Sequence, residues 1–156
     1  VVRFFTNYSE YNHDALHEMQ MNDLTVSGLS DAGAHVSVIF DAVAPTFLLT
    51  HWVRDRQRGP RLPLARVIHR QTQRNAQLFG LHDRGSLEVG KRADVNVIDM
   101  ARLSLGPLAL HRDLPAGGAR LLQPASGYVA TYVNGVRTRH FDRDTGARPG
   151  RLVRSR

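Results

Sequence analysis

The amino-acid sequence predicts a chain with two halves, an α/β segment followed by a β-rich segment. In the first half, apolar residues recur at helical spacing in residues 41–57 and again in residues 64–79. The period changes after Gly80, because apolar and polar residues alternate in residues 93–98 and on both sides of the Asn-Gly dipeptide at 134–135. These observations place the boundary between the two halves near Gly80.

Four elements are expected in the first half. They are a short helix at 13–21, a buried strand at 25–29, and two longer helices at 41–57 and 64–79. Gly59 and Pro60 end the first long helix, while Pro63 suits the first turn of the second and Gly80 its C-terminal cap. A strand followed by helices is the order of an α/β unit.

The second half is expected to contain short strands joined by turns. Valines alternate with polar neighbours at 93–98, which predicts a strand, and both residues at 134–135 tolerate positive φ, which predicts a hairpin turn. Prolines and glycines scattered through residues 107–124 predict a long irregular connection without a helix. The arginine-rich residues 148–156 predict an extended tail.

The composition excludes several kinds of chemistry. The 156 residues contain no cysteine, so disulfides, thiol catalysis and cysteine-ligated zinc are excluded, and a metal would need histidine, aspartate or glutamate. No apolar stretch approaches the roughly 20 residues of a membrane span, and the first residues lack the charged-then-apolar order of a signal peptide. We therefore expect a soluble, cytoplasmic protein without a membrane partner.

The charge is strongly positive, yet its distribution argues against nucleic acid as a partner. The formal net charge is +7, and all but Lys91 of the 21 basic residues are arginine. They are spread from Arg3 to Arg156 with acidic residues between them, and no interleaved aromatic residues suggest a base-stacking platform. A basic nucleic-acid binder is kept as a third hypothesis, after the two described below.

The most informative local feature is the sequence GLSDAGAH at residues 28–35. It places one carboxylate, Asp31, in a loop of small residues directly after the expected strand, where functional groups are commonly built. Two local explanations for Asp31 stay open, a cap on the next helix and an Asx-turn. His35 could orient a ligand or bond the acid, or be purely structural. Ser30 does not fit a GxSxG nucleophile elbow, because the second glycine comes one residue late.

A second candidate site is the sequence HDALH. His13 and His17 are four residues apart and would share one face of a helix, the spacing that holds zinc in HExxH proteases. Asp14 stands where that motif has glutamate, and no third ligand is obvious nearby. The alternative is a pair of solvated surface histidines.

Blocks spread over nearly the whole chain together resemble a known family. They are GLSDAGAH, DAVAPTFLLTHWVRDRQRGPRLPL, TQRNAQLFGLHDRGSLEVGKRADVNVID, DLPAGGARLLQPASGY, YVNGV and TGARPGRLVR. From about Asn7 onward, the chain resembles the C-terminal part of the amidohydrolase superfamily, in the branch of the N-acyl-D-amino-acid deacylases, or D-aminoacylases. The block GLHDRGSLEVGKRADVNVID is widely shared in that superfamily, whereas TGARPGR and the SDAGAH loop narrow the resemblance to the deacylase branch.

The resemblance implies a fold and an activity. Residues 1–81 would be the last strand and helices of a TIM-like barrel, and residues 82–156 would be part of a small β-sandwich domain with an extended basic tail. The implied enzyme is a zinc-dependent hydrolase that cleaves the amide bond of a small N-acylated D-amino acid.

The resemblance also implies roles for the residues of the loop at 28–35. Asp31 matches the aspartate that ends the family's last barrel strand, so it would lie on or beside the zinc and pass a proton from the attacking water to the leaving amine. Ser30, Gly33 and His35 would lie beside that metal site or along the substrate.

The sequence departs from the family in what it lacks. It contains no His-x-His pair, which the family places at the end of its first strand, and its 156 residues cannot close a barrel of about 250 residues. We therefore expect a fragment that is inactive alone, whose partner is the rest of the barrel polypeptide and whose exposed edges favour a homo-oligomer. The alternative is a non-catalytic assembly or interaction module derived from this fold.

Overall fold

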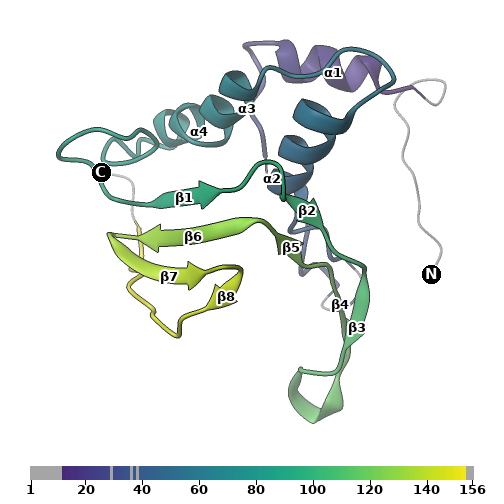
Figure 1. Cartoon of the computed structure of the whole chain (residues 1–156), viewed down its shortest axis with the longest axis vertical. Helices are drawn as coiled ribbons and strands as arrows, with labels where there is room; N and C mark the ends of the chain where they lie inside the picture. Colours follow the sequence, from purple (N-terminus) through teal and green to yellow (C-terminus); the bar gives the residue numbers. More distant parts are fainter. Residues whose placement is uncertain (1–11, 29, 36, 38, 154–156) are drawn as a thin grey trace.

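The computed structural model describes residues 12–28, 30–35, 37 and 39–153, with the helices of the first half of the sequence gathered above the strands in Figure 1. Its helices are α1 (Asp14–Met21), α2 (Ala44–Phe47), the π-helix η1 (Leu48–Asp55), α3 (Leu64–Gln71), α4 (Gln73–Leu78) and the 3₁₀ turn η2 (Pro115–Gly117). Its strands are β1 (Val95–Ile98), β2 (Ser104–Leu105), β3 (Ala109–His111), β4 (Arg120–Leu122), β5 (Ala125–Ser126), β6 (Tyr128–Val133), β7 (Val136–His140) and β8 (Arg143–Asp144).

The helices predicted at 13–21 and 41–57 are present, with altered bounds. The first is α1. The second begins at Ala44, because Pro45 occupies its first turn, and continues without a break from α2 into η1. Both are confirmed as helical segments, and the π-helical geometry of η1 is a feature that apolar spacing does not predict.

The helix predicted at 64–79 is divided into α3 and α4. Thr72 lies at the division, with φ of −122° and ψ of −90°. Its hydroxyl donates a hydrogen bond of 2.8 Å to the carbonyl of Ile68, one helical turn earlier. Such a bond competes with the backbone ladder, so it accompanies the break in the helix.

The strand predicted at 93–98 and the hairpin predicted at 134–135 are both confirmed. Strands β1, β6, β7 and β8 form one antiparallel sheet in the order β1-β6-β7-β8. At the β6–β7 turn, Asn134 and Gly135 have φ of 51° and 77°, the positive values that a tight hairpin needs. The backbone N–H of Asn134 donates a hydrogen bond of 2.7 Å to the Asp94 carboxylate, which ties this turn to the start of β1.

The prediction of an irregular connection at 107–124 is wrong. This segment belongs to an arm of two antiparallel strand pairs, β2 with β5 and β3 with β4, which projects downward in Figure 1. The prolines and glycines of this segment lie mainly at the ends of these short strands and in the turn, where η2 reverses the chain. A bidentate ion pair between Asp113 and Arg120, at 2.8 and 2.7 Å, closes the base of that turn.

The strand predicted at 25–29 is not found, since residues 25–28 form no strand and Leu29 lies outside the described residues. A strand requires a neighbouring backbone, whereas here the carbonyls of Thr25 and Ser27 accept hydrogen bonds from side chains of α3 and α4. The strand pairs of the described residues are all antiparallel and none closes a barrel, so the barrel elements predicted in residues 1–81 are not confirmed.

The hydrophobic core lies where the helices meet the strands. Its buried members come from η1, the segment before α3, α3 itself and the loop before β2; they are Leu49, Trp52, Leu62, Val67 and Leu103. Tyr128 on β6 packs against this cluster and its hydroxyl is hydrogen-bonded to that of Thr46 at 2.7 Å. Residues from both halves of the sequence therefore contribute to a single core.

Candidate functional site

The Asp31 loop, defined as residues 30–35, forms a tight turn on the surface. The N–H of Ala34 donates to the carbonyl of Asp31 at 2.9 Å, and the N–H of Gly33 donates to that of Ile39 at 3.0 Å. Gly33 has φ of 94° and His35 has φ of 53°, so the loop uses left-handed backbone at both positions. These bonds fix the loop through its backbone.

The carboxylate of Asp31 is exposed and has no hydrogen-bond or ion-pair partner among the described residues. Neither of the two local explanations, a helix cap or an Asx-turn, is therefore present in the described contacts. The side-chain bond of this turn comes from its neighbour, because the Ser30 hydroxyl accepts a hydrogen bond of 3.4 Å from the N–H of Ala32. Asp31 thus offers a carboxylate that the local fold does not use.

The other predicted residues lie in the same loop. Ser30 and Gly33 flank Asp31, and His35 is exposed at the end of the turn. No hydrogen bond joins His35 to Asp31 in the described part of the chain, so the structure brings these residues into one loop without linking their side chains.

Two flanking segments hold the Asp31 loop in place. On its N-terminal side, Arg70 of α3 donates to the carbonyls of Asn22 and Thr25, and Asn75 of α4 donates to that of Ser27 at 2.9 Å. On its C-terminal side, the carbonyl of Ser37 accepts a hydrogen bond of 3.1 Å from the N–H of Leu121 on β4.

Sequence reasoning missed Arg70 and Asn75. A signal for the first was available, because Arg70 follows the buried Val67 by three residues and so lies on the inward face of its helix. A buried arginine on an apolar face is unusual and calls for partners nearby.

The described residues do not form a zinc site. Among them no three histidine, aspartate or glutamate side chains come together in a way that could hold a metal ion. Asp31 and His35 supply at most two donors, whereas zinc takes three or four protein ligands. The described residues therefore cannot by themselves hold the zinc that the family resemblance implies, and no reaction step is derived through it.

The pair His13 and His17 does not form a metal site either. The ring of His13 lies 5.9 Å from that of Trp52 and 6.4 Å from that of His51, so it packs on η1. The Nε2 atom of His17 is buried without a hydrogen-bond partner in the described part of the chain. His13, at the start of α1, is thus engaged in packing against η1.

Beside this packing lies a cavity of about 530 Å³, which includes His51, Asp14 and Arg56 in its lining. The Arg56 guanidinium is buried, lies 4.3 Å from the centre of the Trp52 ring and pairs with Asp14 at 3.1 Å. Burial, together with the charge of nearby groups, lowers the pKa of His51. The ion pair uses Nη2 of Arg56, while its Nη1 is buried without a hydrogen-bond partner in the described part of the chain.

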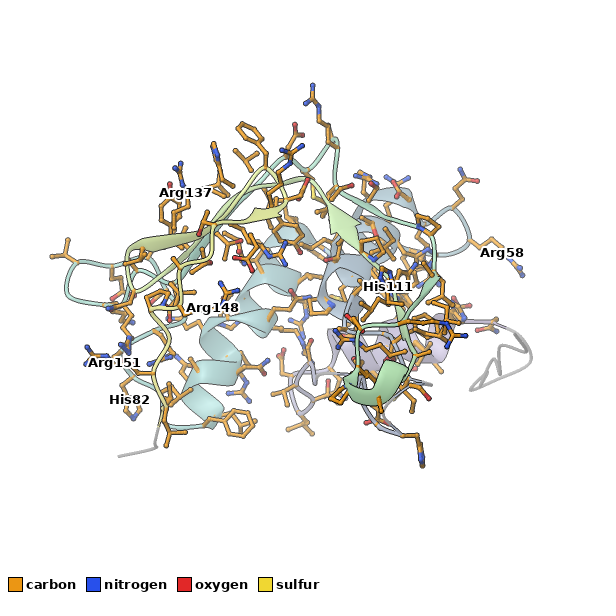
Figure 2. The ribbon with its side chains drawn as sticks, turned by 90° about the horizontal axis from the view of Figure 1, so that it is seen from below. Arg58, His82, His111, Arg137, Arg148 and Arg151 are labelled. Atoms are coloured by element: carbon orange, nitrogen blue, oxygen red, sulfur yellow. The ribbon has the colours of Figure 1, made fainter. Side chains whose placement is uncertain are left out.

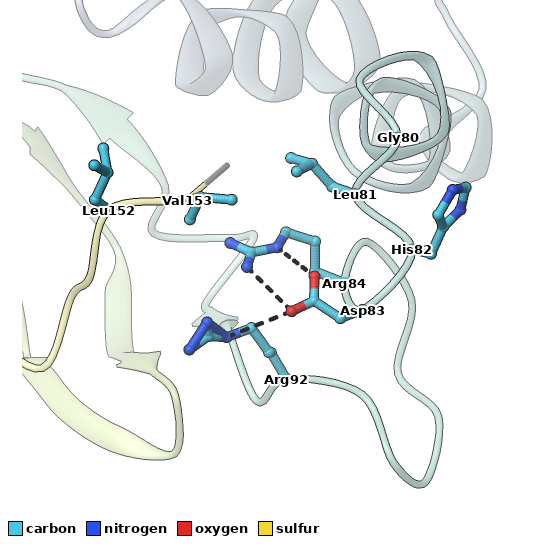
Figure 3. Close-up of a pocket in the computed structure, with 8 residues that line it drawn as sticks. All are labelled: Gly80, Leu81, His82, Asp83, Arg84, Arg92, Leu152 and Val153. Carbon is cyan, nitrogen blue, oxygen red and sulfur yellow. Dashed lines mark hydrogen bonds and ion pairs between the residues drawn. The ribbon is translucent and has the colours of Figure 1, made fainter. Parts of the chain in front are cut away.

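A larger cavity of about 670 Å³ lies between the loop after α4 and the C-terminal tail (Figure 3). Asp83 lies on its wall, hydrogen-bonded to Arg84 at 2.9 Å and 3.9 Å from Arg92. The Arg84 hydrogen bond holds the pKa of the Asp83 carboxyl below its usual range. No residue of the Asp31 loop lines this cavity, so it is separate from the candidate site.

The arginine side chains labelled in Figure 2 are spread across the view. In Figure 2, Arg58 and Arg137 lie on opposite sides of the view, with Arg148 and Arg151 near the tail.

Among the described residues, none of the helices has the length and apolar character needed to cross a membrane.

Comparison with known families gives one match. The family model described as Amidohydrolase family matches residues 6–139, a range that contains the Asp31 loop, all five α- and π-helical segments and most of the strands. No curated protein and no solved structure matches the chain.

Proposed function

Because the chain belongs to the amidohydrolase family, we propose that it is part of a hydrolase that cleaves N-acyl-D-amino acids to a carboxylate and a free D-amino acid. The family membership supports a hydrolase. The narrower substrate rests on the resemblance of SDAGAH and TGARPGR to the deacylase branch. The observation that carries the proposal is the exposed, unpartnered carboxylate of Asp31 inside the matched range.

The chemistry proposed for Asp31 is proton transfer. Hydrolysis forms a bond from water oxygen to the amide carbonyl carbon and breaks the bond from that carbon to nitrogen. The Asp31 carboxylate would accept the proton that the attacking water loses, and then give it to the departing nitrogen, which leaves as an amine. A carboxylate already engaged in a cap or an ion pair would be less able to take up this proton.

The proposal extends to the wider architecture. We infer that residues 1–81 are terminal elements of a catalytic barrel and that residues 82–156 belong to a small β domain. Asp31 would supply one zinc ligand, and the remaining ligands would come from the rest of the barrel polypeptide, since the described residues provide no set of three. Association into a homo-oligomer and a cytoplasmic location belong to the same proposal.

The test is the substitution Asp31→Asn in the complete gene product. An amide cannot accept the proton, so we expect kcat/KM for release of D-methionine from N-acetyl-D-methionine to fall by about 10²- to 10⁴-fold. The matched control is Asp41→Asn, which changes an exposed aspartate ten residues further along. N-acetyl-L-methionine serves as the substrate control.

Two outcomes would contradict this proposal. Turnover unchanged by Asp31→Asn would make Asp31 an ordinary loop residue. A folded complete protein that releases no D-amino acid from acyl derivatives of acidic, neutral or aromatic D-amino acids would favour the non-catalytic module instead.

A further inference from the structure

Arg70 is a buried cation that bonds to a single segment of the chain. Its residue surface is only 5% exposed, and it forms no ion pair with a carboxylate among the described residues. Its guanidinium donates to the carbonyl of Asn22 at 2.8 Å, and to the carbonyl and the hydroxyl of Thr25, both at 2.6 Å. All of its described acceptors therefore lie in the segment that precedes the Asp31 loop.

Hydrogen bonds, rather than apolar packing, hold this segment. Leu24 is 93% exposed, and Val26 and Gly28 are exposed as well, so apolar packing contributes little over these positions. A segment with few buried contacts opens easily unless hydrogen bonds restrain it. Arg70 and the bond from the Asn75 amide to the Ser27 carbonyl restrain it from α3 and α4. The Thr25 hydroxyl also donates to the carbonyl of Met19 at 2.6 Å, and Arg66 pairs with Asp23 at 2.7 Å, so Arg70 acts as one of several polar restraints.

We propose that Arg70 is a positioning residue for Asp31, because it fixes the backbone from which the Asp31 loop departs. The loop is then held at both ends, by α3 and α4 before it and by the Leu121 N–H on β4 after it. Burying a guanidinium is costly unless its donors are used. Nη1 and Nη2 of Arg70 donate to two backbone carbonyls and a hydroxyl of this segment, whereas its Nε is buried without a partner among the described residues. The catalytic part of this inference rests on the proposed function of Asp31.

The first test measures the loop itself by hydrogen–deuterium exchange of the complete protein. In Arg70→Gln, we expect the amides of residues 26–35 to exchange about 10- to 100-fold faster, the effect on an opening equilibrium of losing hydrogen bonds from a charged donor. The control is Arg74→Gln, because Arg74 is exposed on α4 and donates no hydrogen bond among the described residues. Amides of β6 should exchange at the wild-type rate in both variants.

The second test is the pH profile of kcat/KM for N-acetyl-D-methionine. In Arg70→Gln we expect kcat/KM to fall by about 10- to 100-fold, because the Asp31 carboxylate is misplaced. We also expect the midpoint of the acidic limb of the pH profile to shift. Arg70→Lys keeps a buried cationic donor, so its kcat/KM and its acidic midpoint should both lie between those of Arg70→Gln and the wild-type protein. A merely structural role would lower the amplitude of the profile and leave its acidic midpoint unchanged.

The outcomes separate this inference from the proposed function. If wild-type protein shows no turnover, the proposed function fails, while faster exchange confined to residues 26–35 still supports the anchoring role of Arg70. If Asp31→Asn abolishes turnover but Arg70→Gln leaves both exchange and the pH midpoint unchanged, the inference is overturned. Should Arg70→Gln not fold, Arg70→Lys takes its place, because it removes the forked donor that reaches Asn22 and Thr25 together, and exchange of residues 26–35 at the wild-type rate in that variant would equally overturn the inference.

Discussion

At the residue scale, Gly127 is a position that the fold restricts to glycine. Its φ of +106° is left-handed, and a Cβ atom added there would lie 2.6 Å from the Cα of Leu103. Leu103 is fully buried in the core, so neither backbone can move aside without disturbing the packing of helices on strands. Only glycine satisfies both the conformation and the close approach at this position.

We therefore expect Gly127→Ala to lower the free energy of unfolding by about 2–5 kcal/mol, the sum of left-handed strain and overpacking. Equilibrium urea denaturation of the variant measures this change. Gly150→Ala is the control, because nothing lies within 4 Å of a Cβ built there, and it should change stability by less than about 0.5 kcal/mol. Equal stability of the two variants would show that the backbone at Gly127 does not approach Leu103 so closely.

At the residue scale, the sequence indicated Asp31 but not the groups that hold its loop. Asp31 stands out because small residues surround it, which is a local pattern. Arg70 is separated from Thr25 by 45 positions, and that contact exists only once α3 packs beside the segment. Its place on the apolar side of a helix was visible, whereas the identity of its acceptors was not.

At the element scale, elements specified by a local pattern were predicted correctly, whereas elements that depend on long-range pairing were not. Asn134 and Gly135 specify a hairpin by themselves, and the helices follow from apolar spacing. The arm formed by β2 to β5 depends on pairing across the η2 turn, and its short strands carry no clear alternation. The segment at 25–28 failed as a strand for the converse reason, because side chains of α3 and α4 occupy carbonyls that a neighbouring strand would need.

The turn after β8 provides an element-scale prediction about pH. The Asp144 carboxylate bonds to Arg148 at 2.9 and 2.7 Å and accepts the N–H of Gly146 at 2.7 Å. The Arg148 hydrogen bond, followed by that from Gly146, lowers the pKa of Asp144 from its ordinary 3.8 to about 2. Because the folded pKa is depressed, any stabilisation from this turn is present above pH 3.8 and is lost as the pH falls toward 2.

An NMR titration of the Asp144 side-chain carboxyl measures this directly. In Arg148→Gln we expect the midpoint to rise from about 2 toward 3.8, while the Gly146 bond keeps it somewhat below the latter value. Arg151→Gln, an exposed neighbour in the tail, should leave the midpoint where it is. A midpoint that does not respond to Arg148→Gln would show that the ion pair is absent in solution.

At the scale of the whole molecule, the two halves of the sequence depend on one another. Trp52 and Val67 from the helical half pack in the same core as Leu103 from the β-rich half. Arg54 adds polar contacts, donating to the carbonyls of Met100 and Leu103 at 2.6 and 2.9 Å. The candidate site shows the same dependence, since the Asp31 loop is restrained by α3 and α4 on one side and by β4 on the other.

The number of metal ligands that the whole chain brings together limits what the 156 residues can do alone. A zinc site in a hydrolase requires three or four protein ligands. The described residues bring no three histidine, aspartate or glutamate side chains together. We expect the isolated chain to bind no stoichiometric zinc in a titration followed by calorimetry and to release no D-methionine from N-acetyl-D-methionine. The complete gene product, assayed in parallel, is the positive control. Tight zinc binding together with turnover by the isolated chain would contradict the proposal that the remaining ligands lie elsewhere in the polypeptide.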